Sequence, residues 1–485
     1  MLKKSFIILF LANNFFAFSQ DLISSIKLDL KGNRDAFQIV DDSSKKTILF
    51  LSDKKKVNTF LLNDGMYTLD TLSAQRPEKK YSEIIGFSGE KSSPTIYWSS
   101  SNHKEIFAQN YNYQTHQIQN QSYKLELEEE KYVQFFSENK KFYMLTVIEN
   151  SKKLKLYVFD ESKNYMEKTL DFSGFSFFDS LFTNPNLSTV LKDPDTFTNT
   201  YVLERIIPGS KVSLVESAKK RKCYISDNQI FITLDVVPQL TQLITINLET
   251  YAPNVIQINN PVFEKNEDIN SNSFLIDNKL FQLVLSSSKM FFTIKDLNGN
   301  LIKEYSATNK DSIKFKNSQI SRISSQTGTT RILEETSQFL NKVSSATNVG
   351  ISCSKIQDTY LVTIGGISNN RGNPMMTGMG TGMPMGGFGA GGPQMFLSFG
   401  SYNSTLDGFN SYANRKVVYI DCLFDKDGNH IEGAIKNDSF DKIKTFAEKY
   451  GMPFVSKTFF KRDQTYYVGY YSESTKQYSI RSFTD

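Results

Sequence analysis

A short polar turn followed by an apolar strand recurs along the chain. It is seen in DNQIFITL at 227–234, in DNKLFQLV at 277–284 and in ENKKFYML at 138–145. The same pattern returns after Asp358 and after Asp463. Asn and Asp tolerate the backbone angles of tight hairpin turns, and runs of β-branched and aromatic residues favour strands. The sequence therefore predicts a β-hairpin about every 45–50 residues.

Each repeat divides into four strands, which we name A to D in chain order. The A strands are expected to begin near Asp35, Tyr81, Lys131, Phe175, Cys223, Ser273, Gly350 and Phe454. The B strands, such as Thr47–Leu51, are apolar on both faces, as in a strand covered by neighbouring sheets. A repeat of this length built only of strands predicts an all-β fold, a single closed β-propeller of eight four-stranded blades. Seven blades are the alternative if the weak repeat at 175–217 is irregular.

The last repeat lacks a fourth strand, because the sequence ends after strands at 454–460, 466–471 and 477–483. A spare strand lies before the first repeat, at Ile23–Leu30. Pairing the two would complete the last blade and remove an open sheet edge. We therefore expect the N-terminal strand to close the ring.

Three segments interrupt the strand pattern. Apolar residues at helical spacing predict short helices at 329–343 and 439–450. Residues 365–400 are rich in Gly and Met and fall between strands B and C of the seventh repeat. A flexible low-complexity insertion is expected there.

Residues 1–19 have the composition of a secretory signal peptide. Lys3 and Lys4 precede a short apolar run, and Ala17-Phe18-Ser19 fits the small-residue cleavage rule, so the mature chain is expected to be 20–485. A retained membrane anchor is less favoured, since Asn13 and Asn14 interrupt a run that is too short to span a bilayer. The expected location is periplasmic or secreted, without a transmembrane segment in the mature chain.

Charge and cysteine content exclude some classes of protein. The formal net charge is +5, with cationic and anionic residues mixed along the chain, so no nucleic-acid partner is expected. Three cysteines, Cys223, Cys353 and Cys422, are an odd number without a disulfide framework. Cys223 and Cys353 occupy equivalent places in two repeats. We expect all three to be free and buried.

No catalytic motif is recognisable, and no catalytic residue or cofactor is predicted. The three histidines, His103, His116 and His430, lack the spacing of metal ligands and are expected to be solvated. Asp425–Asn429 resembles part of a calcium loop but lacks the remaining acidic ligands, so a plain turn is favoured. The sequence contains neither a nucleophile elbow nor a phosphate-binding loop.

The Gly/Met-rich insertion provides the candidate partner-binding residues, Met375, Met376, Met379, Met383 and Met385. A flexible loop without a ligand is the simplest interpretation. Thioethers also suit Cu(I), and flexible Met side chains adapt to apolar partners. These three interpretations stay open, and no metal site is assigned.

The repeat and the export signal resemble those of secreted bacterial β-propellers, and Phe18-Ser19-Gln20 resembles the end of signals in Bacteroidota. No characterised family is matched. The resemblance implies an exported module that binds or scaffolds an unknown protein or cell-envelope partner. The alternative is a hydrolase or lyase with its site at the mouth of the central channel. Loop carboxylates converging on the channel would favour the enzyme, and a neutral channel with an apolar rim would favour the scaffold.

Overall fold

The structure is a computed structural model. It describes residues 20–484 apart from 33, 162–163, 195–199, 208–210, 265–266, 325–328, 370–414 and 450–454. The expected signal peptide and nearly all of the Gly/Met-rich insertion lie outside the described residues.

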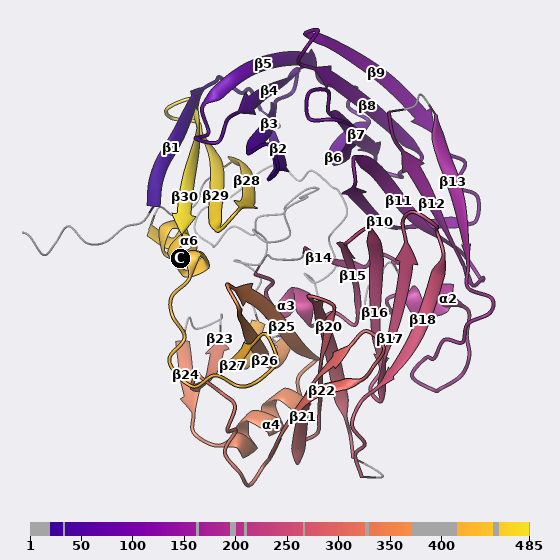
Figure 1. Ribbon diagram of the computed structural model, residues 1–485, viewed down its shortest axis with the longest axis vertical. Coiled ribbons are helices and arrows are strands. Elements are labelled where there is room, and N and C mark those ends of the chain that lie inside the picture. Colours follow the sequence, from indigo (N-terminus) through magenta and orange to yellow (C-terminus); the bar gives the residue numbers. More distant parts are fainter. Residues whose placement is uncertain are drawn as a thin grey trace, which may run out of the picture.

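The described strands form seven sheets that stand around a common centre (Figure 1). Sheet 1 holds β2 (Asp35–Asp41), β3 (Lys46–Ser52), β4 (Lys56–Leu62) and β5 (Thr68–Gln75). Sheet 2 holds β6 (Tyr81–Ser88), β7 (Thr95–Ser100), β8 (Glu105–Asn112) and β9 (Gln117–Lys124). Sheet 3 holds β10 (Glu130–Glu138), β11 (Lys141–Ile148), β12 (Lys153–Phe159) and β13 (Tyr165–Asp171). Each of these sheets is a four-stranded antiparallel meander.

The remaining sheets vary this plan. Sheet 4 holds β14 (Glu204–Ile206), β15 (Arg221–Ser226), β16 (Gln229–Val237), β17 (Leu240–Asn247) and β18 (Pro253–Asn259). Sheet 5 holds β19 (Asn270–Ile276), β20 (Lys279–Leu285), β21 (Lys289–Asp296) and β22 (Leu301–Thr308). Sheet 6 runs in the order β24 (Thr329–Leu333), β23 (Ile320–Ser324), β27 (Arg415–Asp425), β26 (Thr359–Asn369) and β25 (Asn348–Ile356). Sheet 7 runs β1 (Gln20–Lys27), β30 (Gln477–Thr484), β29 (Thr465–Ser472) and β28 (Val455–Arg462).

The described residues thus form an all-β fold of seven sheets, the alternative number, and not eight. Among its described residues, the predicted repeat from Phe175 holds α2 (Leu187–Leu191), β14 and α3 (Leu214–Ser217) in place of four strands. Its chain cannot run as a regular strand, because Asp179 Oδ1 accepts backbone hydrogen bonds from Leu181 and Thr183 at 3.0 and 3.1 Å. Such local side-chain bonds compete with a strand ladder. β14 pairs parallel to β15 and becomes an extra strand of sheet 4.

The recurring turns are confirmed as two-residue hairpin turns between the first and second antiparallel strands of their sheets. Glu138 pairs with Lys141, Ser226 with Gln229, and Ile276 with Lys279, which leaves two residues in each turn. Both residues of each of these three turns have positive φ angles between 47° and 61°. That conformation matches the right-handed twist of the flanking strands.

The N-terminal strand completes the last sheet, as the sequence predicts. β1 pairs antiparallel with β30 from Gln20 opposite Phe483 to Lys27 opposite Gln477. Beyond the strand, Leu30 is buried and its amide donates to the Tyr471 hydroxyl at 3.1 Å. Residues at the two ends of the chain therefore belong to one sheet.

Sheet 6 departs from the prediction in three ways. Residues 329–333 form strand β24 and not a helix, because the β-branched Thr329, Thr330 and Ile332 pair with β23. The predicted helix is therefore shorter: α4 begins at Thr336 and ends at Ser344. The segment after the Asp425 turn, where the four-strand repeat predicts strand D, forms no strand beyond one bridge from His430 to Phe424. The outer edge of β27 is already paired with β23, which leaves that segment no edge to join.

The second predicted helix is confirmed as α6 (Ser439–Lys449).

The insertion in sheet 6 also begins later than predicted. Gly365 and Gly366 lie inside β26 and pair with β25 and β27. A Cβ atom on Gly365 would lie 2.1 Å from the Val418 carbonyl oxygen, and one on Gly366 would lie 2.9 Å from the Cα of Val343. These glycines permit close backbone packing within the sheet and against α4.

A buried polar network ties sheets 4, 5 and 6 together. Lys222, whose side chain is fully buried, donates to the Asp235 carboxylate at 2.9 Å and to Asn272 Oδ1 at 2.7 Å. Asp235 also accepts from the amide and hydroxyl of Ser273. The side-chain amide of Asn272 reaches across to the Val349 carbonyl oxygen at 2.8 Å. Every charge in this network has a partner, as buried charges require.

Among the described residues, no helix is long and apolar enough to cross a membrane.

Deleting Asp21 to Leu30 is expected to lower the melting temperature by several degrees, because it exposes the edge of β30 and the apolar surface under Leu30. Differential scanning calorimetry of the mature chain measures this. Leu22→Ser is the matched control, since that side chain is 53% exposed. A deletion variant that melts like the intact chain would contradict the pairing.

Lys222→Met is expected to lower the free energy of unfolding by about 3–5 kcal/mol, because Asp235 then becomes a buried charge without its counter-ion. Adding Asp235→Asn removes that charge and should recover part of the loss. Lys153→Met breaks an exposed ion pair to Asp171 and should cost less than about 1 kcal/mol. Urea denaturation measures all three, and equal losses in the first and the third variants would refute this role for the network.

Candidate functional site

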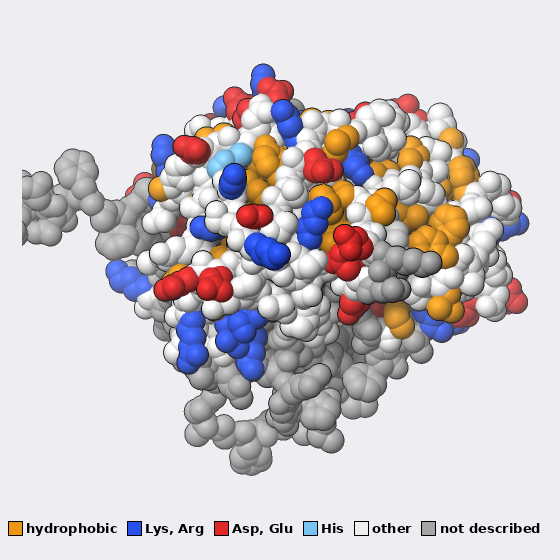
Figure 2. Space-filling model, turned by 90° about the horizontal axis from the view of Figure 1, so that it is seen from below, with side chains coloured by type: hydrophobic (Ala, Val, Ile, Leu, Met, Phe, Trp, Pro, Cys, Tyr) orange, Lys and Arg blue, Asp and Glu red, His pale blue; other side chains and the backbone are white. Residues whose placement is uncertain are grey.

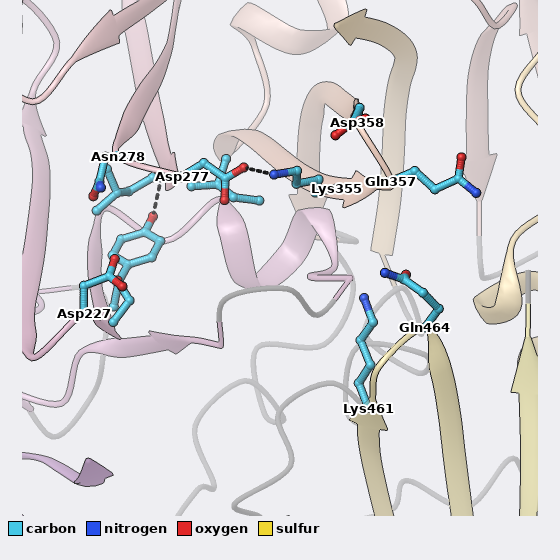
Figure 3. Close-up of a pocket in the computed structure, with 12 residues that line it drawn as sticks. Asp227, Asp277, Asn278, Lys355, Gln357, Asp358, Lys461 and Gln464 are labelled. Atoms are coloured by element: carbon cyan, nitrogen blue, oxygen red, sulfur yellow. Dashed lines mark hydrogen bonds and ion pairs between the residues drawn. The ribbon is translucent and has the colours of Figure 1, made fainter. Parts of the chain in front are cut away.

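A cavity of about 510 Å³ opens where the first hairpin turns of sheets 4, 5, 6 and 7 meet. Figure 3 shows the polar side chains that surround it. Sheet 4 contributes Asp227, sheet 5 contributes Asp277 and Asn278, sheet 6 contributes Lys355, Gln357 and Asp358, and sheet 7 contributes Lys461 and Gln464. Its volume lies in the range of small-ligand clefts.

The repeat itself places these residues together. Asp227, Asp277, Asp358 and Gln464 occupy the short turns that connect the first two antiparallel strands of their sheets. Equivalent turns of sheets arranged around a centre meet at the same end of the ring. In the sequence, these turns indicate the fold only. Their recurrence was also the signal that could have located the site.

Asp277 is held in place by groups from sheet 6. Its carboxylate accepts from the Lys355 ammonium at 2.7 Å and from the Tyr360 hydroxyl at 2.9 Å. Partial burial would raise the pKa of Asp277, but the bonds from Lys355 and Tyr360 outweigh it and lower that pKa. The same carboxylate and burial raise the pKa of Tyr360. Asp277 is therefore an ionised carboxylate that links sheets 5 and 6, and it is ill suited to donate a proton.

Other polar groups around the cavity remain available. Within the described part of the chain, Asp227 and Asp358 have no hydrogen-bond or ion-pair partner, and Lys461 contacts only the ring of Tyr466, at 5.2 Å from its centroid. The side-chain amides of Asn278, Gln357 and Gln464 are likewise free to bind a ligand. Figure 3 shows Asp227 and Asn278 on one side of the cavity, and Lys461 and Gln464 on the opposite side.

The structure does not test the candidate residues from the sequence. Met375, Met376, Met379, Met383 and Met385 all lie outside the described residues, between β26 and β27. No group of three or more His, Cys, Asp or Glu side chains suited to a metal ion occurs among the residues that the structure describes.

The cysteines are free and buried, as the sequence predicts. Cys223 lies in β15 and Cys353 in β25, which are equivalent strands of sheets 4 and 6, and Cys422 lies in β27. Burial raises the pKa of the Cys223 thiol to about 12 and raises the pKa of the other two well above the usual value. Thiols held protonated in this way are poor nucleophiles.

The Asp425 turn uses its carboxylate internally. Oδ1 of Asp425 accepts from the amides of Asp427 and Asn429 at 2.9 and 2.7 Å, and Oδ2 accepts from the Asn429 side chain. These bonds form a plain turn of the favoured kind.

The prediction that all three histidines are solvated is wrong for His103. Its ring lies 4.4 Å from that of Tyr132 and 5.1 Å from that of Phe135, between centroids. Its Nδ1 is 3.0 Å from the Ser99 hydroxyl. The turn at Ser100–Glu105 folds it inward, a placement that polar neighbours in the sequence do not reveal. His116 is exposed beside Asp70, and His430 is half-buried against Asn317.

Burial lowers the pKa of His103 from 6.5 to about 4. The unfolded chain thus binds this proton more readily than the folded chain, so stability should fall as the pH drops from about 6.5 to about 4. His103→Gln keeps a partner for Ser99 and should flatten that part of the pH–stability curve. Proton NMR of the imidazole measures the pKa directly. A folded-state value near 6.5 would contradict the burial.

Charged side chains of both signs are mixed on the face shown in Figure 2. That face therefore lacks a single-sign patch of the kind that binds nucleic acid.

No family model and no curated protein matches the chain. Among solved structures, it is similar to cobalt-substituted apocarotenoid oxygenase from Synechocystis, with 8% identity, a TM-score of 0.29, and coverage of 58% of this chain and 62% of that chain. It is also similar to a mutant of AofleA from Arthrobotrys oligospora, with 9% identity, a TM-score of 0.25, and coverage of 71% and 86%. The chain spans about three fifths of the oxygenase, at 62%. At these scores the likeness supports no conclusion about activity, and no characterised family is matched.

Proposed function

We propose that this chain is an exported, single closed β-propeller that acts as a binding or scaffolding module. The cavity at the turns of sheets 4 to 7 is its ligand site, and its location is the periplasm or the cell exterior. The observation that carries this proposal is the meeting of turns from four successive sheets around 510 Å³ of space, with polar groups left without partners.

Contacts between the first and last sheets support closure of the ring. The Gln38 side chain donates to the Phe459 carbonyl oxygen at 3.1 Å, and Arg462 donates to the Lys45 carbonyl oxygen at 3.3 Å. Sheet 7 itself contains both β1 and β30. A closed ring leaves no end sheet with an uncovered face.

The composition of residues 1–19 supports export. Cleavage after Ser19 would also leave β1 whole, because that strand begins at Gln20. Free cysteines are compatible with this reading, since burial keeps all three thiols protonated and out of reach of external oxidants.

A hydrolase or lyase remains the second candidate, favoured by one observation: Asp227, Asp277 and Asp358 all line the cavity. A general acid needs a carboxyl group whose pKa is raised towards neutrality. Asp277 has a lowered pKa and is occupied by Lys355 and Tyr360. We therefore favour binding over catalysis.

Photo-crosslinking tests the proposed site in living cells. p-Benzoylphenylalanine at Gln464, in the cavity, should give a discrete adduct on irradiation. The same residue at Thr115, in an exposed turn of sheet 2, should give none. Cell fractionation and N-terminal sequencing of the same protein should find the chain outside the cytoplasm and starting at Gln20. A full-length cytoplasmic chain would refute export, and equal labelling at both positions, or none at Gln464, would refute the site.

A further inference from the structure

We infer that the cavity binds a short polar peptide segment that carries cationic groups together with a carboxylate. This inference rests on the proposed binding function and adds the chemical class of the ligand. It follows from which polar groups around the cavity already have partners and which do not.

The charges without partners set the charge of the ligand. Three carboxylates and two ammonium groups line the cavity, but Lys355 and Asp277 neutralise each other at 2.7 Å. Asp227, Asp358 and Lys461 remain. A ligand of one sign would meet at least one like charge, whereas a ligand with both signs can pair with all three. The excess of carboxylates favours a ligand with more cationic than anionic groups.

The amides between these charges favour peptide groups. Asn278, Gln357 and Gln464 each offer an N–H donor and a carbonyl acceptor from one side chain. A peptide bond presents the same pair of groups in return. Figure 3 shows Asn278 on the same side of the cavity as Asp227, and Gln357 and Gln464 on the side of Lys461, so an extended segment that spans the cavity can meet an amide and a charge at each end.

The cavity suits a sugar less well. Bound sugars are usually stacked on an exposed aromatic ring, and the aromatic residue in the lining is Tyr224. That side chain is only 1% exposed, and its hydroxyl accepts from the Leu275 amide at 3.3 Å. It therefore offers little surface for stacking.

A phage-displayed library of random heptapeptides, selected on the purified mature chain, tests this inference. Enriched peptides should contain Lys or Arg together with Asp or Glu. Synthetic copies should bind at least about tenfold more weakly to Asp227→Asn/Asp358→Asn and to Lys461→Gln, and more weakly at high salt. Asn tolerates the positive φ of 50° at residue 227, so the turn should survive the substitution.

Glu334→Gln and Lys310→Gln, exposed and outside the cavity, are the matched controls and should bind like the unaltered chain. Failure to enrich peptides, enrichment of uncharged peptides, or equal binding by all variants would overturn the peptide inference. A glycan array that gives cavity-dependent binding would also overturn it and would identify a sugar ligand. Adducts at Gln464 in cells would leave the proposed binding function standing in each of these cases.

Discussion

The pairing of β1 with β30 is the constraint on which the arrangement of the sheets depends. It places residues 20–27 and 477–484 in one sheet, so the first and last parts of the chain become neighbours. The inner strands β2 and β28 then lie side by side, with Gln38 bonded to the Phe459 carbonyl. Without β1, β30 would be an open edge, and sheet 7 would have only β28, β29 and β30 to pack against sheet 1. The position of Lys461 and Gln464 beside sheet 6 depends on the same contact.

The hairpin turns serve both the fold and the cavity. Asp227 and Asp277 adopt the positive φ angles that set the strand register, and Asp or Asn fills such positions at little cost in strain. The same residues carry the carboxylates of the cavity. Because the turn backbone is fixed by the ladder on either side, these side chains project from a rigid support, which would limit the entropy lost in the proposed binding.

The period of the repeat and the chemistry of its turns predicted the strands and the pairing of the N-terminal strand with the last repeat. Local sequence also predicted α6 and the buried cysteines. These signals did not predict the number of sheets, because side-chain bonds such as those of Asp179 replace the ladder in the weak repeat. Nor did they predict that β23 pairs with β27 in sheet 6, with β24 outside it, since the choice between two segments for the edge of β27 is made by tertiary pairing. The cavity residues were visible as turns, but their convergence depends on how the sheets are arranged around their common centre. The Met residues singled out from the sequence lie outside the described residues, so their role stays a prediction.

The buried network and the cavity occupy different ends of the same sheets. Asn272 bonds to Lys222 of sheet 4 and to the Val349 carbonyl of sheet 6, while Asp277, at the other end of β19, bonds to Lys355. Sheet 5 is thus joined to sheet 6 near both ends of its inner strand. A rotation of either sheet would break both bonds, and the buried side-chain amide of Asn272 would then lose a hydrogen-bond partner, which costs free energy. Asp277 and Asn278 are therefore held near Lys355 and Gln357, so the proposed binding function would take its selectivity in this part of the cavity from the geometry of the free chain and not from closure around the ligand.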